Sequence, residues 1–305
     1  MKILIVGLVN NPQFKRVREE ANSRGHTVDG CYASELVIYS THETFEPTLR
    51  GRKLEDYDLI YLWTVGKRRW EWYVAVEYLN TRFGTLIVNK VVIDPKSNYS
   101  PTPALSYLKQ FENKLPFPAS AVVFSHKSVE SVEEKFKFPV IVKSSTAHKG
   151  KGVFKADNAD ELRHIIKENK DISPAFIIRE LIPNDGDIRV FCVGYKAIGA
   201  MKRTPKKGEF RSNISLGGKG EKFDLKSAKG VIDLAEKVAQ VTGIEIAGVD
   251  IMINTETGNF YILEVNPGPQ FTGLEKYAGV NAALEIMKYF EKLYNKHHGK
   301  LRDPG

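Results

Sequence analysis

The sequence predicts a mixed α/β and α+β protein, in which a small open parallel sheet precedes a larger α+β part. Three observations support this fold class. Strand-like and helix-like segments alternate over residues 1–94, as in a parallel α/β unit. The turn-rich segment Asp94–Pro103 is typical of a linker into a further unit. Near the C-terminus, Ala247–Pro269 contains two β-branched strands joined by a turn at Asn254–Asn259, which predicts a hairpin.

The first unit is assigned from its hydrophobic pattern. Its predicted strands are Lys2–Leu8, Thr27–Tyr32, Asp58–Trp63 and Leu86–Asn89, and its predicted helices are Pro12–Arg24 and Glu71–Phe83. No Gly-x-Gly-x-x-Gly pattern follows the first strand, so a dinucleotide is not indicated. The basic cluster Lys67–Arg69 stands beside two tryptophans at a strand-to-helix turn. It is either a contact for an anionic acceptor or the solvated start of a helix.

Composition indicates an ordinary globular protein with a basic surface. The 305 residues are 42% hydrophobic and carry a formal charge of +8, which favours anionic partners in general. The apolar run Ile3–Val9 is too short to span a membrane, so we expect a cytoplasmic protein. Cys31 and Cys192 provide neither a disulfide framework nor a metal site, and both are expected to be buried thiols.

A lysine-rich loop follows the predicted strand Phe138–Lys143. Ser144–Gly152 contains small residues, two glycines and two lysines, a composition that suits a flap whose backbone N–H groups approach a polyphosphate. Its alternative is a surface hairpin. A Walker A loop is excluded, because no Gly-Lys-Ser/Thr opens a helix here.

Further polar residues stand at the ends of predicted strands. Glu180 lies in the apolar strand Phe176–Ile182, where its carboxylate needs a hydrogen-bond donor such as a nucleotide. After the turn at Pro183–Gly186, Asp187 and Arg189 share one strand face. A basic run follows, with Lys202, Arg203, Lys206, Lys207 and Arg211. The remaining predicted strands are Ala119–Phe124 and Val153–Ala156. The remaining predicted helices are a short one ending at Phe111, one capped near Asp157–Asn158, and Lys127–Phe136, Lys226–Val241 and Gly279–Lys292, and a frayed end is expected from Asn295.

The C-terminal hairpin gathers oxygen ligands. Asp250 lies on its first strand, and Glu264 and Asn266 lie on one face of its second strand, two residues apart. Two carboxylates and a carboxamide suit a hard cation such as Mg²⁺. The alternative is that these residues are the solvated ends of a hairpin.

The order of these motifs resembles the ATP-grasp ligases, most closely the RimK-type glutamate ligases. The resemblance covers residues 95–293 and uses Lys143, the glycine loop, Glu180-Leu-Ile, Asp187-Ile-Arg189, Phe210-Arg-Ser-Asn213, Asp250 and Glu264-Val-Asn266. It implies an ATP-grasp fold of two α+β subdomains clasping ATP. The expected units are an N-terminal domain over 1–94, a central subdomain over 95–185, a C-terminal subdomain over 186–295 and a tail over 296–305.

The resemblance also assigns roles to residues. ATP is expected to contact Lys96, Lys143, Lys149, Gly150, Gly152, Glu180, Leu181, Ile182, Asp187, Arg189 and Lys202. Two Mg²⁺ ions, with Mn²⁺ as a substitute, are expected at Asp250, Glu264 and Asn266. Catalysis is assigned to Arg211 and Asn213, which would meet the transferred phosphoryl group, and to Lys143. The chain departs from the family at Lys202, where an acid is usual, and at Pro267–Phe271, where a turn of small residues is usual.

These features predict an ATP-dependent, ADP-forming carboxylate–amine ligase that works through an acyl phosphate. It would add glutamate or another amino acid to an anionic small-molecule or peptide acceptor, with no membrane partner. A kinase that stops at phosphoryl transfer is one alternative, and a ribosome- or RNA-binding scaffold is another, although nucleic acid is not the expected partner. Related ligases are often dimers or tetramers, so a homo-oligomer is expected.

Overall fold

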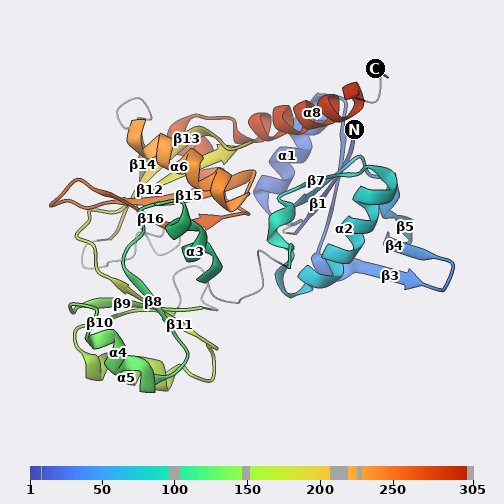
Figure 1. Ribbon diagram of the computed structural model, residues 1–305. Coiled ribbons are helices and arrows are strands. Elements are labelled where there is room, and N and C mark those ends of the chain that lie inside the picture. Colours follow the sequence, from blue (N-terminus) through green and yellow to red (C-terminus); the bar gives the residue numbers. More distant parts are fainter. Residues whose placement is uncertain (8, 96–103, 146–151, 207–218, 225–228, 301–305) are drawn as a thin grey trace.

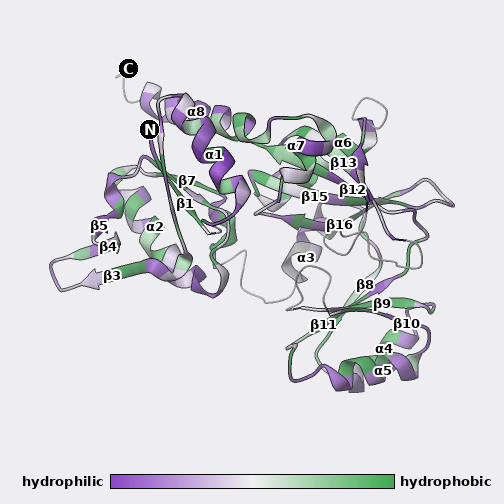
Figure 2. Cartoon of the chain, turned by 180° about the vertical axis from the view of Figure 1, so that it is seen from behind, coloured by the Kyte–Doolittle hydropathy of each residue, from purple (hydrophilic) through white to green (hydrophobic). Residues whose placement is uncertain are grey.

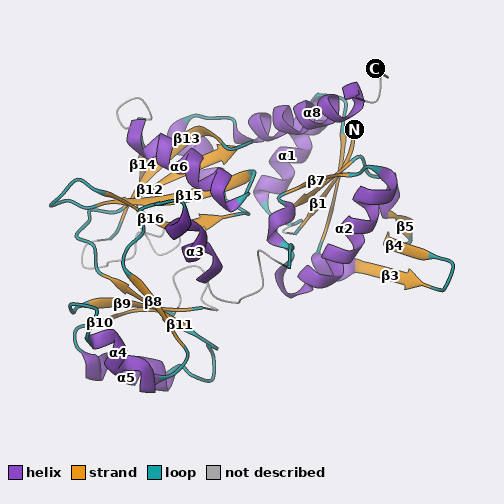
Figure 3. Ribbon diagram, viewed as in Figure 1, coloured by secondary structure: helices purple, strands orange, loops and turns teal. Residues whose placement is uncertain are grey.

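Four β-sheets with helices around them make up the described part of the chain (Figures 1 and 3). The computed structural model describes residues 1–7, 9–95, 104–145, 152–206, 219–224 and 229–300. Within them, the N-terminal sheet, the central sheet and the C-terminal sheet each build a separate layer. The start of β1 (Lys2–Val6) and the end of α8 (Ala282–Lys300) lie close together at the outer end of the N-terminal layer (Figure 1).

The N-terminal sheet is parallel, as the sequence predicts, with strand order β2-β1-β6-β7. Its elements are β1 (Lys2–Val6), α1 (Pro12–Ser23), β2 (Thr27–Cys31), β6 (Leu59–Leu62), α2 (Arg69–Phe83) and β7 (Leu86–Val88). Because β1 alternates its faces, Ile3 and Ile5 pack with α1 while Leu4 and Val6 pack with Trp72 of α2. Asn11 caps α1 by accepting a hydrogen bond from the backbone of Gln13.

A small antiparallel sheet in the N-terminal region is absent from the sequence prediction. It consists of β3 (Leu36–Ser40), β4 (Phe45–Leu49) and β5 (Arg52–Lys53), and it projects beside α2 (Figure 1). Its anchor is aromatic: the ring centroids of Phe45 and Tyr78 lie 4.9 Å apart. Pro47 within β4 weakens the local strand signal, which explains why the pattern does not reveal it.

The central sheet is antiparallel, with order β10-β9-β11-β8, and α4 and α5 cover one face (Figure 1). Its elements are β8 (Ser120–Val123), α4 (Val129–Glu133), β9 (Val140–Ser144), β10 (Val153–Ala156), α5 (Ala159–Glu168) and β11 (Phe176–Glu180). The predicted helix Lys127–Phe136 is therefore too long, since a 3₁₀ turn at His126–Ser128 precedes the short α4. α5 carries both hydrophobic and hydrophilic residues (Figure 2), and its Leu162 and Ile166, four residues apart on one face, are buried.

The C-terminal sheet is also antiparallel, with order β14-β13-β12-β15-β16. Its elements are β12 (Asp187–Val193), β13 (Lys196–Thr204), β14 (Lys219–Lys222), α6 (Lys229–Thr242), β15 (Ile246–Ile253), β16 (Phe260–Asn266) and α7 (Thr272–Ala278). The hairpin β15–β16 confirms the predicted turn at residues 254–259. The helix α3 (Ala104–Glu112) lies between the central and C-terminal sheets (Figure 1), and Leu115 just after it joins the C-terminal core.

The last helix, α8 (Ala282–Lys300), covers the N-terminal sheet beside α1 (Figure 1). Its buried Met287 and Phe290 share one core cluster with Ile3 of β1 and Phe191 of β12, so the N-terminal and C-terminal layers are packed together. The expected frayed end from Asn295 is wrong, because α8 continues to Lys300 and the Tyr294 and His298 rings pack 4.1 Å apart.

Two further expectations concern cysteines and membranes. Cys31 and Cys192 are both free and buried, as predicted, and burial raises the pKa of each thiol to about 12. None of the described helices is long and apolar enough to span a membrane.

Candidate functional site

Four strands of the C-terminal sheet place charged side chains opposite one another. On β12, Asp187 and Arg189 are two residues apart and therefore share a face. In the sheet register, Asp187 lies opposite Arg203 of β13 and Arg189 lies opposite Asp250 of β15. Asp250 in turn lies opposite Glu264 of β16. The proximity of Asp250 and Glu264 predicted from the hairpin is confirmed.

The turn that begins β12 depends on a glycine. Gly186 has φ +129°, and a Cβ at this position would lie 2.1 Å from the Arg203 carbonyl oxygen. Asn184 fixes the turn, since its Oδ1 accepts a 3.0 Å hydrogen bond from the Gly186 N–H. The close approach of the two chains sets Asp187 directly beside Arg203.

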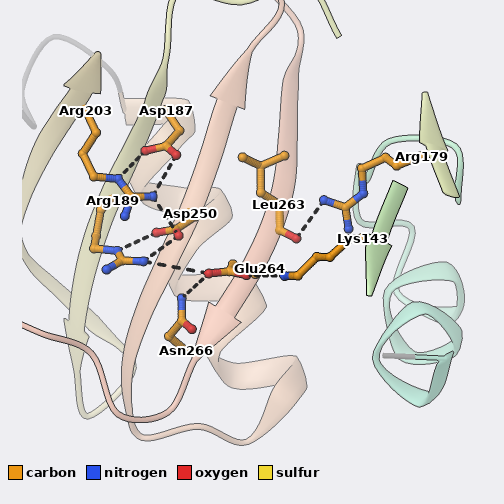
Figure 4. A network of polar contacts seen from close by, with 9 residues as sticks. All are labelled: Lys143, Arg179, Asp187, Arg189, Arg203, Asp250, Leu263, Glu264 and Asn266. Atoms are coloured by element: carbon orange, nitrogen blue, oxygen red, sulfur yellow. Dashed lines mark hydrogen bonds and ion pairs between the residues drawn. The ribbon is translucent and has the colours of Figure 1, made fainter. Parts of the chain in front are cut away.

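A buried ion-pair network runs across these strands (Figure 4). Arg203 donates from Nε and Nη2 to the two oxygens of Asp187, at 2.6 and 2.8 Å. The same Nη2 lies 2.8 Å from Asp250 Oδ2. Arg189 also holds Asp250 with two hydrogen bonds, of 2.7 and 2.6 Å. Two guanidinium groups therefore converge on the single carboxylate of Asp250.

The network crosses from the C-terminal sheet to the central sheet at Glu264 (Figure 4). Lys143, on β9 of the central sheet, donates a 3.0 Å hydrogen bond to Glu264 Oε2. Asn266 donates to Glu264 Oε1 at 2.9 Å, and Arg189 Nη2 lies 4.0 Å from the same oxygen. A second crossing is made by Arg179 of β11, which donates to the Leu263 carbonyl at 3.2 Å.

The charges in this network stabilise one another. Burial is the largest single influence on Glu264 and opposes its ionisation, but Lys143, Asn266 and Arg189 together outweigh burial and hold the pKa of Glu264 well below its usual range. Burial also acts to lower the pKa of Arg203, yet Asp250 and Asp187 raise it above its ordinary value. The pKa of Arg189 is raised in the same way, with Asp250 outweighing burial. All three side chains are therefore charged at neutral pH.

The residues predicted as metal ligands fit a hard divalent cation by their donor chemistry. Glu264 is ionised and half-exposed, and the Asn266 carboxamide lies against it. Asp250 is buried, its Oδ1 accepts from Arg189, and its Oδ2 lies beside both Arg189 and Arg203, so a cation would compete with these guanidinium groups for the carboxylate. Among the described residues, no three or more His, Cys, Asp or Glu side chains are grouped so that they could hold a metal ion.

The remaining predicted nucleotide residues that the structure describes lie on or beside strands of the central and C-terminal sheets. At the end of β11, Glu180 Oε1 accepts from the Ala119 N–H at 2.7 Å, and the Ile182 carbonyl accepts from Asn184 at 2.7 Å, with the half-buried Leu181 between them. Gly152 closes the β9–β10 hairpin, where its carbonyl accepts from the Ser144 N–H. Lys202 forms a 2.6 Å ion pair with Asp185. Five predicted residues lie outside the described ranges: Lys96, Lys149, Gly150, Arg211 and Asn213.

The sequence prediction did not single out Arg203 or Arg179 as site residues. Arg203 was grouped with a basic run, although its neighbour Lys202 points to the other strand face and pairs with Asp185. Asp187 and Arg189 share one face of β12, and the hairpin between β12 and β13 brings Arg203 opposite Asp187. This pairing is the signal that could have identified Arg203. Arg179 had no such signal, because its partners lie on α3 and β16.

The fold and this site define an ATP-grasp protein. A family model described as the RimK-like ATP-grasp domain matches residues 105–290. The chain belongs to this family and is an ATP-dependent, ADP-forming ligase of the RimK type.

Individual relatives match over nearly the whole chain. The chain is 28% identical to a probable alpha-L-glutamate ligase of Picosynechococcus sp., over 99% of each chain, and 29% identical to one of Legionella pneumophila, over 96% of each. Among solved structures, the ATP-grasp ligase PsnB complexed with minimal precursor has a TM-score of 0.68 and 19% identity, with 98% of each chain covered.

Proposed function

We propose that this ligase joins the amino group of glutamate or a similar amino acid to a carboxylate of an anionic peptide or small-molecule acceptor. The observation that carries this proposal is the Lys143–Glu264 contact between the central and C-terminal sheets. It brings a cation from one sheet beside the predicted metal ligands of the other. The printed names of the relatives, probable alpha-L-glutamate ligases, support glutamate as the amine.

The proposed reaction has two steps. A carboxylate oxygen of the acceptor attacks the γ-phosphorus of ATP, the bond to the β-phosphate oxygen breaks, and ADP leaves with an acyl phosphate formed. The amine nitrogen then attacks the acyl carbon, inorganic phosphate leaves, and the nitrogen loses a proton. The product is an amide, and no covalent bond to the protein is formed.

The side chains of the network have distinct tasks in this proposal. Lys143 turns from Glu264 toward the phosphates, where its ammonium balances charge on the transferred group. Asp250, Glu264 and Asn266 would hold Mg²⁺, which supplies charge neutralisation at the phosphate oxygens when bound. Arg189 and Arg203 hold Asp250 in place. Glu180, Leu181 and Ile182 would bind the adenine. Asp187 would bind the ribose by exchanging hydrogen bonds from Arg203 for hydrogen bonds from the ribose hydroxyls.

The test combines product analysis with trapping. Purified protein is incubated with ATP, Mg²⁺ and a panel of acidic peptides and polycarboxylates, with and without glutamate. We expect ADP, phosphate and a product whose mass equals acceptor plus glutamate minus water. Hydroxylamine in place of glutamate should yield the acceptor hydroxamate, which reports the acyl phosphate. A stable phosphorylated product would instead support a kinase, and binding of RNA without any turnover would support a scaffold.

Two variants test the metal ligands directly. Glu264→Gln and Asn266→Ala should each lower kcat/KM at least about a hundredfold, since about 3 kcal/mol of transition-state stabilisation corresponds to that factor. Glu256→Gln, in the exposed turn of the same hairpin, is the matched control and should match wild type. Normal activity in both ligand variants would refute the assignment.

A further inference from the structure

Asn89 joins two distant parts of the chain through one buried amide. It follows β7 in the N-terminal layer, it is fully buried, and its φ is +59°. Its Nδ2 donates to the carbonyls of Ile246, at 3.0 Å, and Pro267, at 2.8 Å. Its Oδ1 accepts from the Ile246 N–H at 3.0 Å. The side chain thus satisfies backbone groups of the C-terminal sheet, not of its own layer.

The two partners of Asn89 belong to the strands that carry the predicted metal ligands. Ile246 begins β15, which delivers Asp250, and Pro267 directly follows Asn266 at the end of β16. In the register, Gly248 of β15 lies opposite Asn266, so the start of one strand and the end of the other are neighbours. The Asn89 amide therefore links these two strand ends beyond their last backbone pair.

The segment after Asn266 is also held by a second contact from the N-terminal layer. A Cβ on Gly268 would lie 2.5 Å from Trp63 Cδ1, and the Trp63 ring is stacked on Phe271 with centroids 6.2 Å apart. The sequence Pro267–Phe271, which departs from the usual small-residue turn, thus packs against the carboxyl end of β6.

We propose that Asn89 is a positioning residue for the metal ligands Glu264 and Asn266. It fixes the Pro267 carbonyl, and hence the peptide that follows Asn266, so that the Asn266 carboxamide keeps its place against Glu264, to which its Nδ2 donates. The inference rests on the proposed metal site. Outer-shell partners of this kind set ligand orientation, and their loss commonly costs 10- to 100-fold in metal affinity.

The same junction supplies a control. Glu245 accepts from the Asn89 backbone N–H at 2.7 Å and from the Tyr289 hydroxyl at 2.7 Å. Tyr289→Phe removes one hydrogen bond between α8 and Glu245 without touching Pro267. It therefore weakens the junction and leaves the proposed ligand-positioning contact intact.

The experiment measures how Mg²⁺ concentration controls ADP binding to the full chain, by titration calorimetry. Asn89→Gly is the main variant, because glycine adopts φ +59° without strain and removes only the amide. We expect the Mg²⁺ concentration for half-maximal ADP binding to rise about tenfold or more. Asn89→Asp, which tolerates this backbone region but cannot donate to Ile246 and Pro267, should shift it at least as far.

The outcomes separate the two proposals. If wild-type protein binds ADP equally well with Mg²⁺ and with a chelator, the proposed metal site itself fails. If wild type requires Mg²⁺ but Asn89→Gly and Asn89→Asp keep the wild-type dependence, the role of Asn89 is overturned. A shift in Tyr289→Phe as large as that in Asn89→Gly would also overturn it, since general loosening of the junction would then explain both. Should Asn89→Gly fail to fold, the Asn89→Asp titration decides.

Discussion

Replacement of Arg203 by methionine tests the buried network most directly. The side chains of Arg203 and Asp187 are 6% and 5% exposed, so their charges are removed from water. Arg203→Met leaves the Asp187 carboxylate without its bidentate cation and takes one of two guanidiniums from Asp250. Loss of one partner of a buried pair costs about 3–5 kcal/mol, and we expect this loss in the free energy of unfolding.

The measurement is urea unfolding with linear extrapolation. Arg163→Met is the control, because Arg163 forms ion pairs on the surface with Asp160 and Glu133 and should cost under about 1 kcal/mol. The double variant Arg203→Met/Asp187→Leu should lose less than the sum of the two single variants, by about 2 kcal/mol or more. Equal losses for Arg203→Met and Arg163→Met would refute the reasoning, as would strict additivity.

Two further predictions concern packing and pH. Gly268→Ala should destabilise the protein by about 1–3 kcal/mol in the same urea assay, because the new Cβ meets both the ring and the backbone carbonyl of Trp63; an unchanged midpoint would contradict the packing. The hydrogen bond from Arg24 lowers the pKa of Glu291 to about 2, so its contribution is present above the ordinary carboxyl pKa of about 4.3 and is lost as the pH falls toward 2. Glu291→Gln should therefore have a lower urea midpoint than wild type at pH 6 but not at pH 2, and a difference that persists at pH 2 would argue against this pair.

Local patterns in the sequence were sufficient to predict the strands that carry the site. The alternation of Glu264 and Asn266, and the turn before them, place these side chains on one face near Asp250, as found. These features depend on neighbours within one hairpin. They do not reveal that two arginines already hold Asp250, because that depends on the register of β12 against both β15 and β13, and the second register shifts between Phe191 and Cys192.

Long-range packing was much less accessible from sequence. The apolar stripe of α8 is evident at Ala282, Met287 and Phe290, but its spacing does not say that the stripe covers the N-terminal sheet. Asn89 likewise gives no local signal, since all its side-chain partners are more than 150 residues away. The short helix α7 was missed because its N-cap residue, Phe271, makes no side-chain capping bond.

The hydrophobic cores divide the described part of the molecule into two packed units. The first unit contains both the N-terminal and C-terminal sheets, whose apolar side chains pack together around Phe191, Phe271 and Phe290. The second unit is the central sheet with α4 and α5, and its core cluster contains only side chains of this unit, from Val123 to Ile178. Among the described residues of the central sheet, Lys143 and Arg179 form hydrogen bonds to the first unit, and water can replace such polar contacts. A movement of the central sheet relative to the other two would therefore not have to open its hydrophobic core.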